Sequence, residues 1–207
     1  MIISHKHRYI FFAIPKTATH SVREALHHYS ADGDWQQQLL FTEQTIPLPE
    51  IAEIKHGHIS VQQLEPAIDP AQWHSYFRFA FVRNPFDRFV STCAFLNRQN
   101  PRFQANSLLW MKMALERPVF RARILAIPQS DLLTDANGQL GVDFIGRYET
   151  LQASMDTVFE HLGLPSVELR VRNPSEHAHY REYYDDHLRA LVENFYQADL
   201  QRFNYTF

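Results

Sequence analysis

Two short apolar runs, each followed directly by a helical pattern, constrain the fold of this chain more than any other feature. The first run covers residues 9–14 (YIFFAI) and the second residues 76–82 (YFRFAFV), in which Arg78 is the one charged residue. Both runs are rich in aromatic and β-branched side chains and short enough to be strands buried on both faces. Strands that alternate with helices predict an α/β fold with a mainly parallel central sheet flanked by helices.

A hydroxyl-rich segment follows the first run. Its residues are Pro15, Lys16, Thr17, Ala18, Thr19, His20 and Ser21, and a helical pattern starts at about Ala18. Backbone N–H groups and the positive end of the helix dipole converge at such a helix start, where a lysine and several hydroxyls add donors suited to phosphate or sulfate oxygens. Ser or Thr near a cap is also ordinary where a strand turns into a helix, so spacing alone leaves both interpretations open. The segment lacks glycine and the Walker A pattern, which disfavours an ordinary ATP or GTP site.

The second run ends at Arg83, and a helix is expected to start with Asn84 as its cap and Pro85 in its first turn. Arg83 at the strand end and Ser91 about two turns into that helix can bring a guanidinium and a hydroxyl to one phosphate. The alternative is an Arg83 paired with Asp87 and a neutral Ser91. Because ligands of α/β sheets bind at the carboxyl ends of the strands, Lys16 and Arg83 are expected at the same sheet edge.

A third candidate is the tripeptide His56-Gly57-His58. In an extended segment the two imidazoles would project to the same face, and the glycine would permit close backbone approach. No cysteine or carboxylate at recognisable ligand spacing accompanies them, so a metal site is not indicated. Since the chain has 12 histidines, a surface pair without function is the alternative.

The first two segments resemble the phosphate-binding motifs of the carbohydrate sulfotransferases, the sulfotransferase family 2 that includes the heparan 2-O and chondroitin types. Residues 15–21 are similar to the family's P-K-T-A-[GS]-T-S loop, with Thr19 and His20 as departures, and residues 83–91 are similar to its R-[ND]-P-x-[DE]-R-x-x-S motif. The resemblance implies 3′-phosphoadenosine-5′-phosphosulfate (PAPS) as donor. The loop would hold its 5′-phosphosulfate, and Arg83 and Ser91 its 3′-phosphate.

The resemblance extends over nearly the whole chain and implies further roles. His56-Gly57-His58 resembles a segment of the 2-O-sulfotransferases whose second histidine acts as a base, which makes His58 the catalytic base and His56 an orienting or substrate-contacting residue. Tyr148, in the segment 144–149, resembles a tyrosine near adenine in cytosolic relatives. The implied fold is a P-loop-NTPase-like three-layer α/β fold, in a single sulfotransferase domain over residues 1–207 of a bacterial-type member.

Length and composition indicate the number of domains, the kind of partner and the cellular location. A length of 207 residues with 45% apolar side chains suits one buried domain, and a net charge of −3 gives no sign of a nucleic-acid partner. Cys93 is the only cysteine, which agrees with a reducing compartment. The N-terminus resembles no signal peptide and the first apolar run is too short to span a bilayer, so we expect a cytoplasmic enzyme or an isolated catalytic domain.

The sequence also predicts the remaining elements. We expect a short strand near residues 39–41, helix starts at Ser60 and at Asp69, helices over 104–115 and 119–127, a hairpin or returning strand pair over 132–148, an amphipathic helix over 149–162 closed by Gly163, a loop containing Asn173 and Pro174, and a last helix over 180–196.

The expected reaction is in-line transfer of a sulfuryl group from PAPS to an acceptor hydroxyl, suggested by the family to lie on a glycan or glycolipid. His58 would remove the hydroxyl proton, and Lys16 with its loop would stabilise the leaving phosphate, without a metal. The alternatives are a P-loop-like kinase that uses ATP and a non-catalytic nucleotide-binding protein. The sequence leaves the acceptor and the oligomeric state open.

Overall fold

The computed structural model describes residues 1–38, 43–44, 46–169 and 179–207. The chain divides into two compact units, Met1–Val82 with Asp131–Arg172, and Arg83–Ser130 with Asn173–Phe207. The single domain expected from the sequence stays a prediction. The strand expected near residues 39–41 and the loop expected at Asn173 and Pro174 lie outside the described residues.

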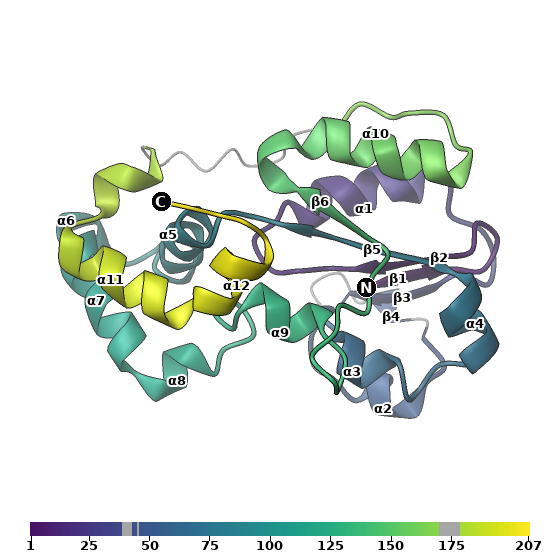
Figure 1. The fold of residues 1–207 in the computed structure, drawn as a ribbon, viewed down its shortest axis with the longest axis horizontal. Coiled ribbons are helices and arrows are strands. Elements are labelled where there is room, and N and C mark those ends of the chain that lie inside the picture. Colours follow the sequence, from purple (N-terminus) through teal and green to yellow (C-terminus); the bar gives the residue numbers. More distant parts are fainter. Residues whose placement is uncertain (39–42, 45, 170–178) are drawn as a thin grey trace. The chain divides into compact units, whose positions relative to one another are not determined.

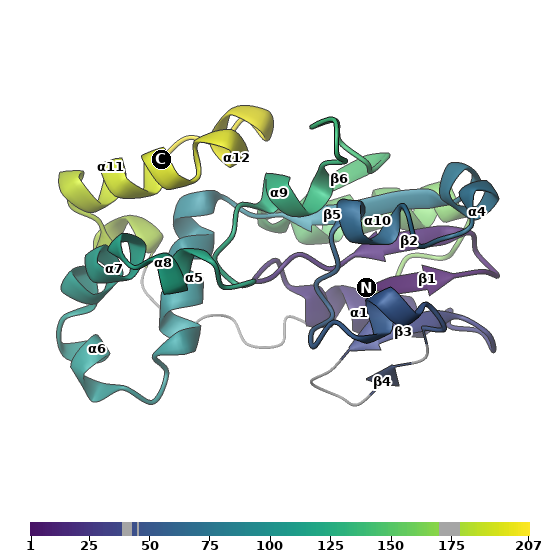
Figure 2. The same cartoon turned by 90° about the horizontal axis from the view of Figure 1, so that it is seen from below.

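The first unit is built on one β-sheet. Its strands, in chain order, are β1 (Ile2–Ser4), β2 (Tyr9–Phe12), β3 (Trp35–Gln38), β4 (Glu43–Gln44), β5 (Phe77–Val82) and β6 (Phe144–Arg147). Their order across the sheet is β4-β3-β1-β2-β5-β6, and Figure 2 shows the strands in this order. The two apolar runs of the sequence form β2 and β5, which confirms them as strands.

The sheet is mixed rather than mainly parallel. β2, β5 and β6 run parallel, with Phe12 opposite Ala80 and Ala80 opposite Ile145. β1 pairs with β2 as an antiparallel hairpin, and β3 continues the antiparallel side. Strand β1 was not predicted from the sequence, because three residues are too few to show a strand pattern. The parallel part nevertheless places the carboxyl ends of β2, β5 and β6 at one edge.

Helices cover both faces of this sheet (Figure 1). On one face lie α1 (Thr19–His27) and α10 (Leu151–Leu162), which bury apolar side chains against Phe11, Phe79 and Phe81 of the strands. On the other face lie α2 (Pro49–Ala52), α3 (Val61–Leu64) and α4 (Pro70–Ser75). The sequence therefore predicted the α/β class correctly, with helices on each side of a sheet.

Several predicted helix ends are confirmed by their caps. The Ser60 side chain accepts from Gln63 N and Gln63 Oε1 accepts from Ser60 N, a capping box at the start of α3. Asp69 Oδ1 accepts from the backbone of Ala71 and Gln72 at the start of α4. At the end of α10, Gly163 takes the left-handed conformation (φ 65°), which a glycine adopts without a Cβ penalty.

The structure of residues 132–148 differs in part from the hairpin or strand pair that was expected there. Residues Gln129–Leu133 form helix α9 instead of a strand, and only Thr134 and Leu140 make an isolated antiparallel bridge across the turn. The returning strand exists as β6, but it pairs parallel with β5. The physical reason for α9 lies in the second unit, where a distant carboxylate accepts from the first amides of this helix.

The second unit is helical in its described residues. Its elements are α5 (Pro85–Leu96), α6 (Pro101–Ala105), α7 (Ser107–Glu116), α8 (Pro118–Arg121), η3 (Tyr180–Tyr183), α11 (Asp186–Phe195) and α12 (Gln197–Arg202). The expected helix over 104–115 is divided at Asn106, whose side chain caps α7. The expected helix over 119–127 is only the short α8, and the last helix starts later than expected, after η3.

The core of this unit includes the apolar stripe of α5, with Phe86, Phe89, Val90 and Cys93 all buried. Arg88 of the same helix is also buried and donates to the carbonyls of Ile127 and Leu125. A buried guanidinium needs such acceptors, because an unpaired buried charge strongly destabilises a fold.

Among the described residues, the helices are too short or too polar to cross a membrane.

Candidate functional site

The loop after β2 turns the chain through two left-handed residues. Lys16 has φ 68° and Ala18 has φ 60°, a region that side chains other than glycine rarely adopt. Inside the turn, the buried Thr17 hydroxyl donates to Ile14 O at 3.0 Å. Each left-handed residue costs about 1–2 kcal/mol. Strain of this kind gathers at ligand-binding loops, since the rest of the fold holds it in place.

Helix α1 begins at this turn without a side-chain cap. Ala18 is its N-cap residue and carries no side chain that can cap the helix, and Val22 N donates to Ala18 O at 3.2 Å. The N–H groups of Thr19, His20 and Ser21 precede the first i to i−4 bond of the helix. Amides at a helix start, together with the positive end of the helix dipole, are donors of the kind that bind anions.

The side chains of this loop differ in exposure. Thr17 and Ser21 are buried, Lys16 and Thr19 are half-buried, and His20 is exposed. The strand, turn and helix start that the sequence predicted over residues 9–21 are thus confirmed. Whether the loop binds a phosphosulfate is not tested by its conformation and stays a prediction.

His58 is tied to the end of strand β2. Its Nδ1 lies 2.7 Å from the carbonyl oxygen of Ala13, two residues before Pro15. A carbonyl can only accept, so Nδ1 carries the proton and Nε2 carries the lone pair in the neutral ring. This hydrogen bond places the imidazole beside the strand that leads into the Lys16 loop, with the tautomer that a general base requires.

Burial lowers the pKa of His58 from its ordinary 6.5 to about 3. The hydrogen bond to Ala13 opposes this shift, because it favours the protonated ring. At neutral pH the imidazole is therefore neutral, the form that accepts a proton. With a pKa this low, His58 can hold a proton near neutral pH only when a negative charge nearby raises its pKa.

His56 lies next to His58, with ring centroids 6.1 Å apart, and burial lowers its pKa too. The chain bends through residues 54–57, so the extended segment expected here is wrong. Gly57 does permit the close approach: a Cβ on Gly57 would lie 2.3 Å from Gln37 O, so another residue would force the backbone apart. Within the part of the chain that the structure describes, no three His, Cys, Asp or Glu side chains are grouped to hold a metal ion.

Tyr148 directly follows β6, in the short helix η2 (Tyr148–Thr150), and is half-buried. Because Ala80 pairs with Phe12 on one side and with Ile145 on the other, Tyr148 follows its strand at the same sheet edge as the Lys16 loop. The structure thus gathers the loop, His58, His56 and Tyr148 in the first unit.

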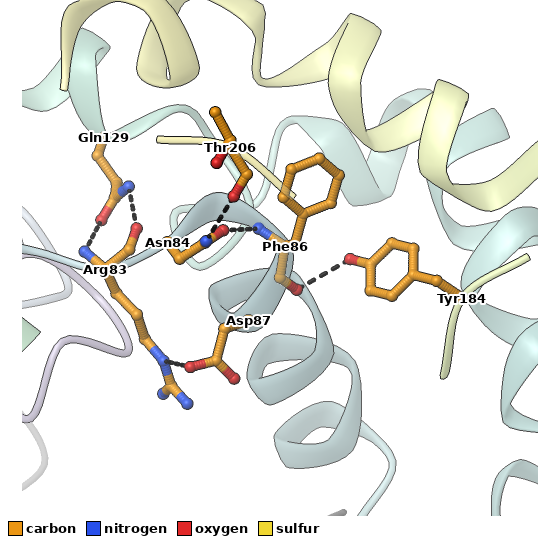
Figure 3. Close-up of polar contacts among 7 residues, drawn as sticks. All are labelled: Arg83, Asn84, Phe86, Asp87, Gln129, Tyr184 and Thr206. Carbon is orange, nitrogen blue, oxygen red and sulfur yellow. Dashed lines mark hydrogen bonds and ion pairs between the residues drawn. The ribbon is translucent and has the colours of Figure 1, made fainter. Parts of the chain in front are cut away.

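Arg83 and Ser91 belong to the second unit. The backbone of Arg83 is held on both sides by one side chain: Arg83 N donates to Gln129 Oε1 at 2.9 Å, and Gln129 Nε2 donates to Arg83 O at 2.9 Å (Figure 3). Arg83 is 4% exposed and Gln129 is fully buried. The amide of Gln129 therefore binds both backbone polar groups of Arg83, directly after β5 has ended at Val82.

The guanidinium of Arg83 forms an ion pair with the helix that follows it. Arg83 Nε donates to Asp87 Oδ2 at 2.7 Å, the contact raised as an alternative in the sequence analysis (Figure 3). Ser91 lies one further turn along α5, on the same helix face as Asp87, and is buried. The ion pair engages Nε of the guanidinium.

Asn84 fixes the start of α5. Its Oδ1 accepts from Phe86 N at 3.0 Å, as the sequence predicted, and its Nδ2 donates to Thr206 O at 3.0 Å (Figure 3). Tyr184 Oη donates to Phe86 O at 2.9 Å in the same turn. Arg83 thus precedes a helix start that is stabilised by the side chains of Asn84 and Tyr184 and by the backbone of Thr206.

Gln129 and Asp199 were not predicted as site residues from the sequence. Asp199 accepts from Gln129 N and Ser130 N, both at 2.8 Å, which explains why α9 begins as a helix there. One signal was available: Asp199 occupies a helical-spacing stripe with Val192, Tyr196 and Phe203, all buried. A carboxylate in an otherwise apolar stripe indicates a buried acceptor with designated donors.

Comparison with known proteins supports the resemblance noted in the sequence. No curated protein and no solved structure matches the chain. The sequence does match the model of the sulfotransferase family, over residues 1–206. That match covers both the strand-loop-helix segment around Lys16 and the Arg83 helix start, and the chain therefore belongs to the sulfotransferase family.

Proposed function

We propose that this protein transfers a sulfuryl group from PAPS to an acceptor hydroxyl, with the Lys16 loop as the site of the 5′-phosphosulfate. The observation that carries the proposal is the turn before α1, where the left-handed Lys16 and Ala18 lead directly into the first amides of a helix. Membership of the sulfotransferase family supports transfer of a sulfuryl group in general. Donors already oriented toward a leaving phosphate stabilise the charge that develops on it.

His58 is the proposed base. Its Nε2 is the nitrogen that can take the proton of the acceptor hydroxyl, because Nδ1 is held by Ala13 O. A phosphosulfate bound at the neighbouring loop would bring negative charge, which raises the pKa of an imidazole and opposes the effect of burial. His58 would then gain basicity only with donor bound, and His56 would orient it or contact the acceptor.

The remaining contacts follow the same proposal. Arg83 and Ser91 are assigned to the 3′-phosphate and Tyr148 to the adenine. A guanidinium already oriented by Asp87 loses little further freedom when it binds a phosphate, which supports this role for Arg83. We further propose a glycan or glycolipid acceptor, a P-loop-like fold acting as one domain, and a cytoplasmic location.

Nucleotide-dependent thermal unfolding tests the donor. Adenosine 3′,5′-bisphosphate, the desulfated product, is expected to raise the unfolding temperature more than ATP or ADP at equal concentration, because a ligand that binds only the folded state stabilises it. A larger shift with ATP would favour a kinase instead. Transfer of labelled sulfate from PAPS to any glycan or glycolipid would exclude a purely nucleotide-binding role.

A further inference from the structure

The backbone of Arg83 is clamped by a side chain from 46 residues away in the sequence. Gln129 meets both polar groups of the Arg83 main chain at 2.9 Å, in a geometry like that of a β-ladder pair. A planar side-chain amide that binds both the N–H and the C=O of one residue restricts the backbone of that residue to one orientation. The direction in which the Arg83 side chain leaves the main chain is therefore set by Gln129.

Gln129 is itself held by a buried carboxylate. Asp199 Oδ2 accepts from Gln129 N at 2.8 Å and from Gln129 Nε2 at 3.3 Å, and its Oδ1 accepts from Ser130 N at 2.8 Å. Asp199 and Gln129 are both fully buried. A buried carboxylate is costly unless donors satisfy it, and here three N–H groups of two adjacent residues do so.

The two ends of Arg83 are thus fixed separately. Gln129 fixes the backbone, and Asp87 fixes the guanidinium through Nε at 2.7 Å. Anion recognition by a guanidinium depends on its orientation, so a loosened backbone would weaken phosphate binding even when the Asp87 pair is intact.

We propose that Gln129, held in place by Asp199, is a positioning residue that aligns Arg83 with the 3′-phosphate of the donor. The proposal rests on the function proposed above, in which Arg83 binds that phosphate. Since Gln129 acts through Arg83, its substitution should weaken only the binding of ligands that carry a 3′-phosphate.

The test compares two nucleotides that differ in that group, adenosine 3′,5′-bisphosphate and adenosine 5′-monophosphate, by calorimetric titration. For the wild-type chain we expect tighter binding of the bisphosphate. Gln129→Leu should reduce this preference by about tenfold, which corresponds to a coupling of about 1.4 kcal/mol. Thr92→Val is the matched control, because it removes the buried bond from Thr92 Oγ1 to Leu125 O without touching Arg83. The control should keep the wild-type preference.

A double-mutant cycle separates positioning from general damage. In an Arg83→Ala background, Gln129→Leu should have no further effect on the preference. Equal weakening of both nucleotides by Gln129→Leu, or an unchanged preference, would overturn the positioning role. If circular dichroism shows Gln129→Leu to be unfolded, Asp199→Asn takes its place with the same expectations. A wild-type chain without any preference, or an Arg83→Ala variant that keeps it, would instead refute the proposed function.

Discussion

The Lys16 loop and the Arg83 helix start are both candidate phosphate sites, but different forces hold them. The loop is shaped by its own backbone, through the left-handed Lys16 and Ala18 and one local bond from Thr17. The Arg83 site is shaped by side chains, above all Gln129 and Asp87. Substituting a side chain should therefore alter mainly activity at the first site, but both stability and ligand binding at the second.

The largest effect is expected for Lys16→Ala. Removing a preorganised donor to a developing charge typically reduces kcat about a hundredfold or more. Because the loop is held by its backbone, the unfolding temperature should hardly change. Lys6→Ala, an exposed lysine in the turn between β1 and β2, is the control and should leave turnover unchanged. Sulfate transfer from PAPS measures both, and normal turnover of Lys16→Ala would reject the role of Lys16.

Asp87→Asn should show the opposite behaviour. It keeps the side-chain shape but leaves the Arg83 guanidinium, 5% exposed, without its carboxylate. Breaking such a pair should lower the free energy of unfolding by about 3 kcal/mol, the low end for a buried pair because Asp87 is 17% exposed. Glu193→Gln provides the control, since its pair with Arg189 is about half exposed and contributes little. Urea unfolding measures both variants, and equal losses would contradict a buried ion pair at this site.

A pH series tests the burial of His58 beside the Lys16 loop. In the unfolded chain the imidazole takes up a proton near pH 6.5, but in the folded chain only near pH 3. Its contribution to stability is therefore complete above pH 6.5 and declines as the pH falls. Between pH 7 and pH 5 the wild-type chain should lose about 2 kcal/mol more than His58→Gln. Parallel stability curves would show that His58 is not buried as a neutral ring.

The smallest effect should come from Ala18→Gly. Glycine adopts φ 60° without a steric penalty, so relief of strain should outweigh the greater freedom of the unfolded chain and raise stability by about 0.5–1 kcal/mol. The same change at Ala153, exposed in α10, should lower stability by about that amount. Thermal unfolding of both variants checks the contrast. Destabilisation by Ala18→Gly would mean that the turn is not strained.

The same contrast explains what could be predicted from the sequence. Residues 9–21 specify strand, turn and helix through adjacent residues, and Asn84 caps its helix from two positions away, so both segments were predicted correctly. Helix α9 was not, because the carboxylate that stabilises its start is Asp199, 70 residues further on. The local sequence pattern does not indicate a hydrogen-bond partner so far away in the chain.

The surroundings of His58 lay beyond sequence reasoning for the same reason. Its tautomer depends on Ala13 O, 45 residues earlier, and the bend around Gly57 depends on the approach of Gln37. The resemblance to known motifs pointed to His58, but only the fold reveals the hydrogen bond that orients its ring.

The pairing of the sheet has a consequence for how the chain reaches its native state. The β1–β2 hairpin joins neighbouring residues and can form within about 1–10 μs. By contrast, β5 and β6 come together across long stretches of chain, as in the bond between Arg78 and Asp143, 65 residues apart. Nonlocal pairing slows folding, so refolding should be limited by the parallel half of the sheet. The Lys16 turn, which follows a strand of that half, would gain its final geometry late, and the appearance of nucleotide binding during refolding would report this last step.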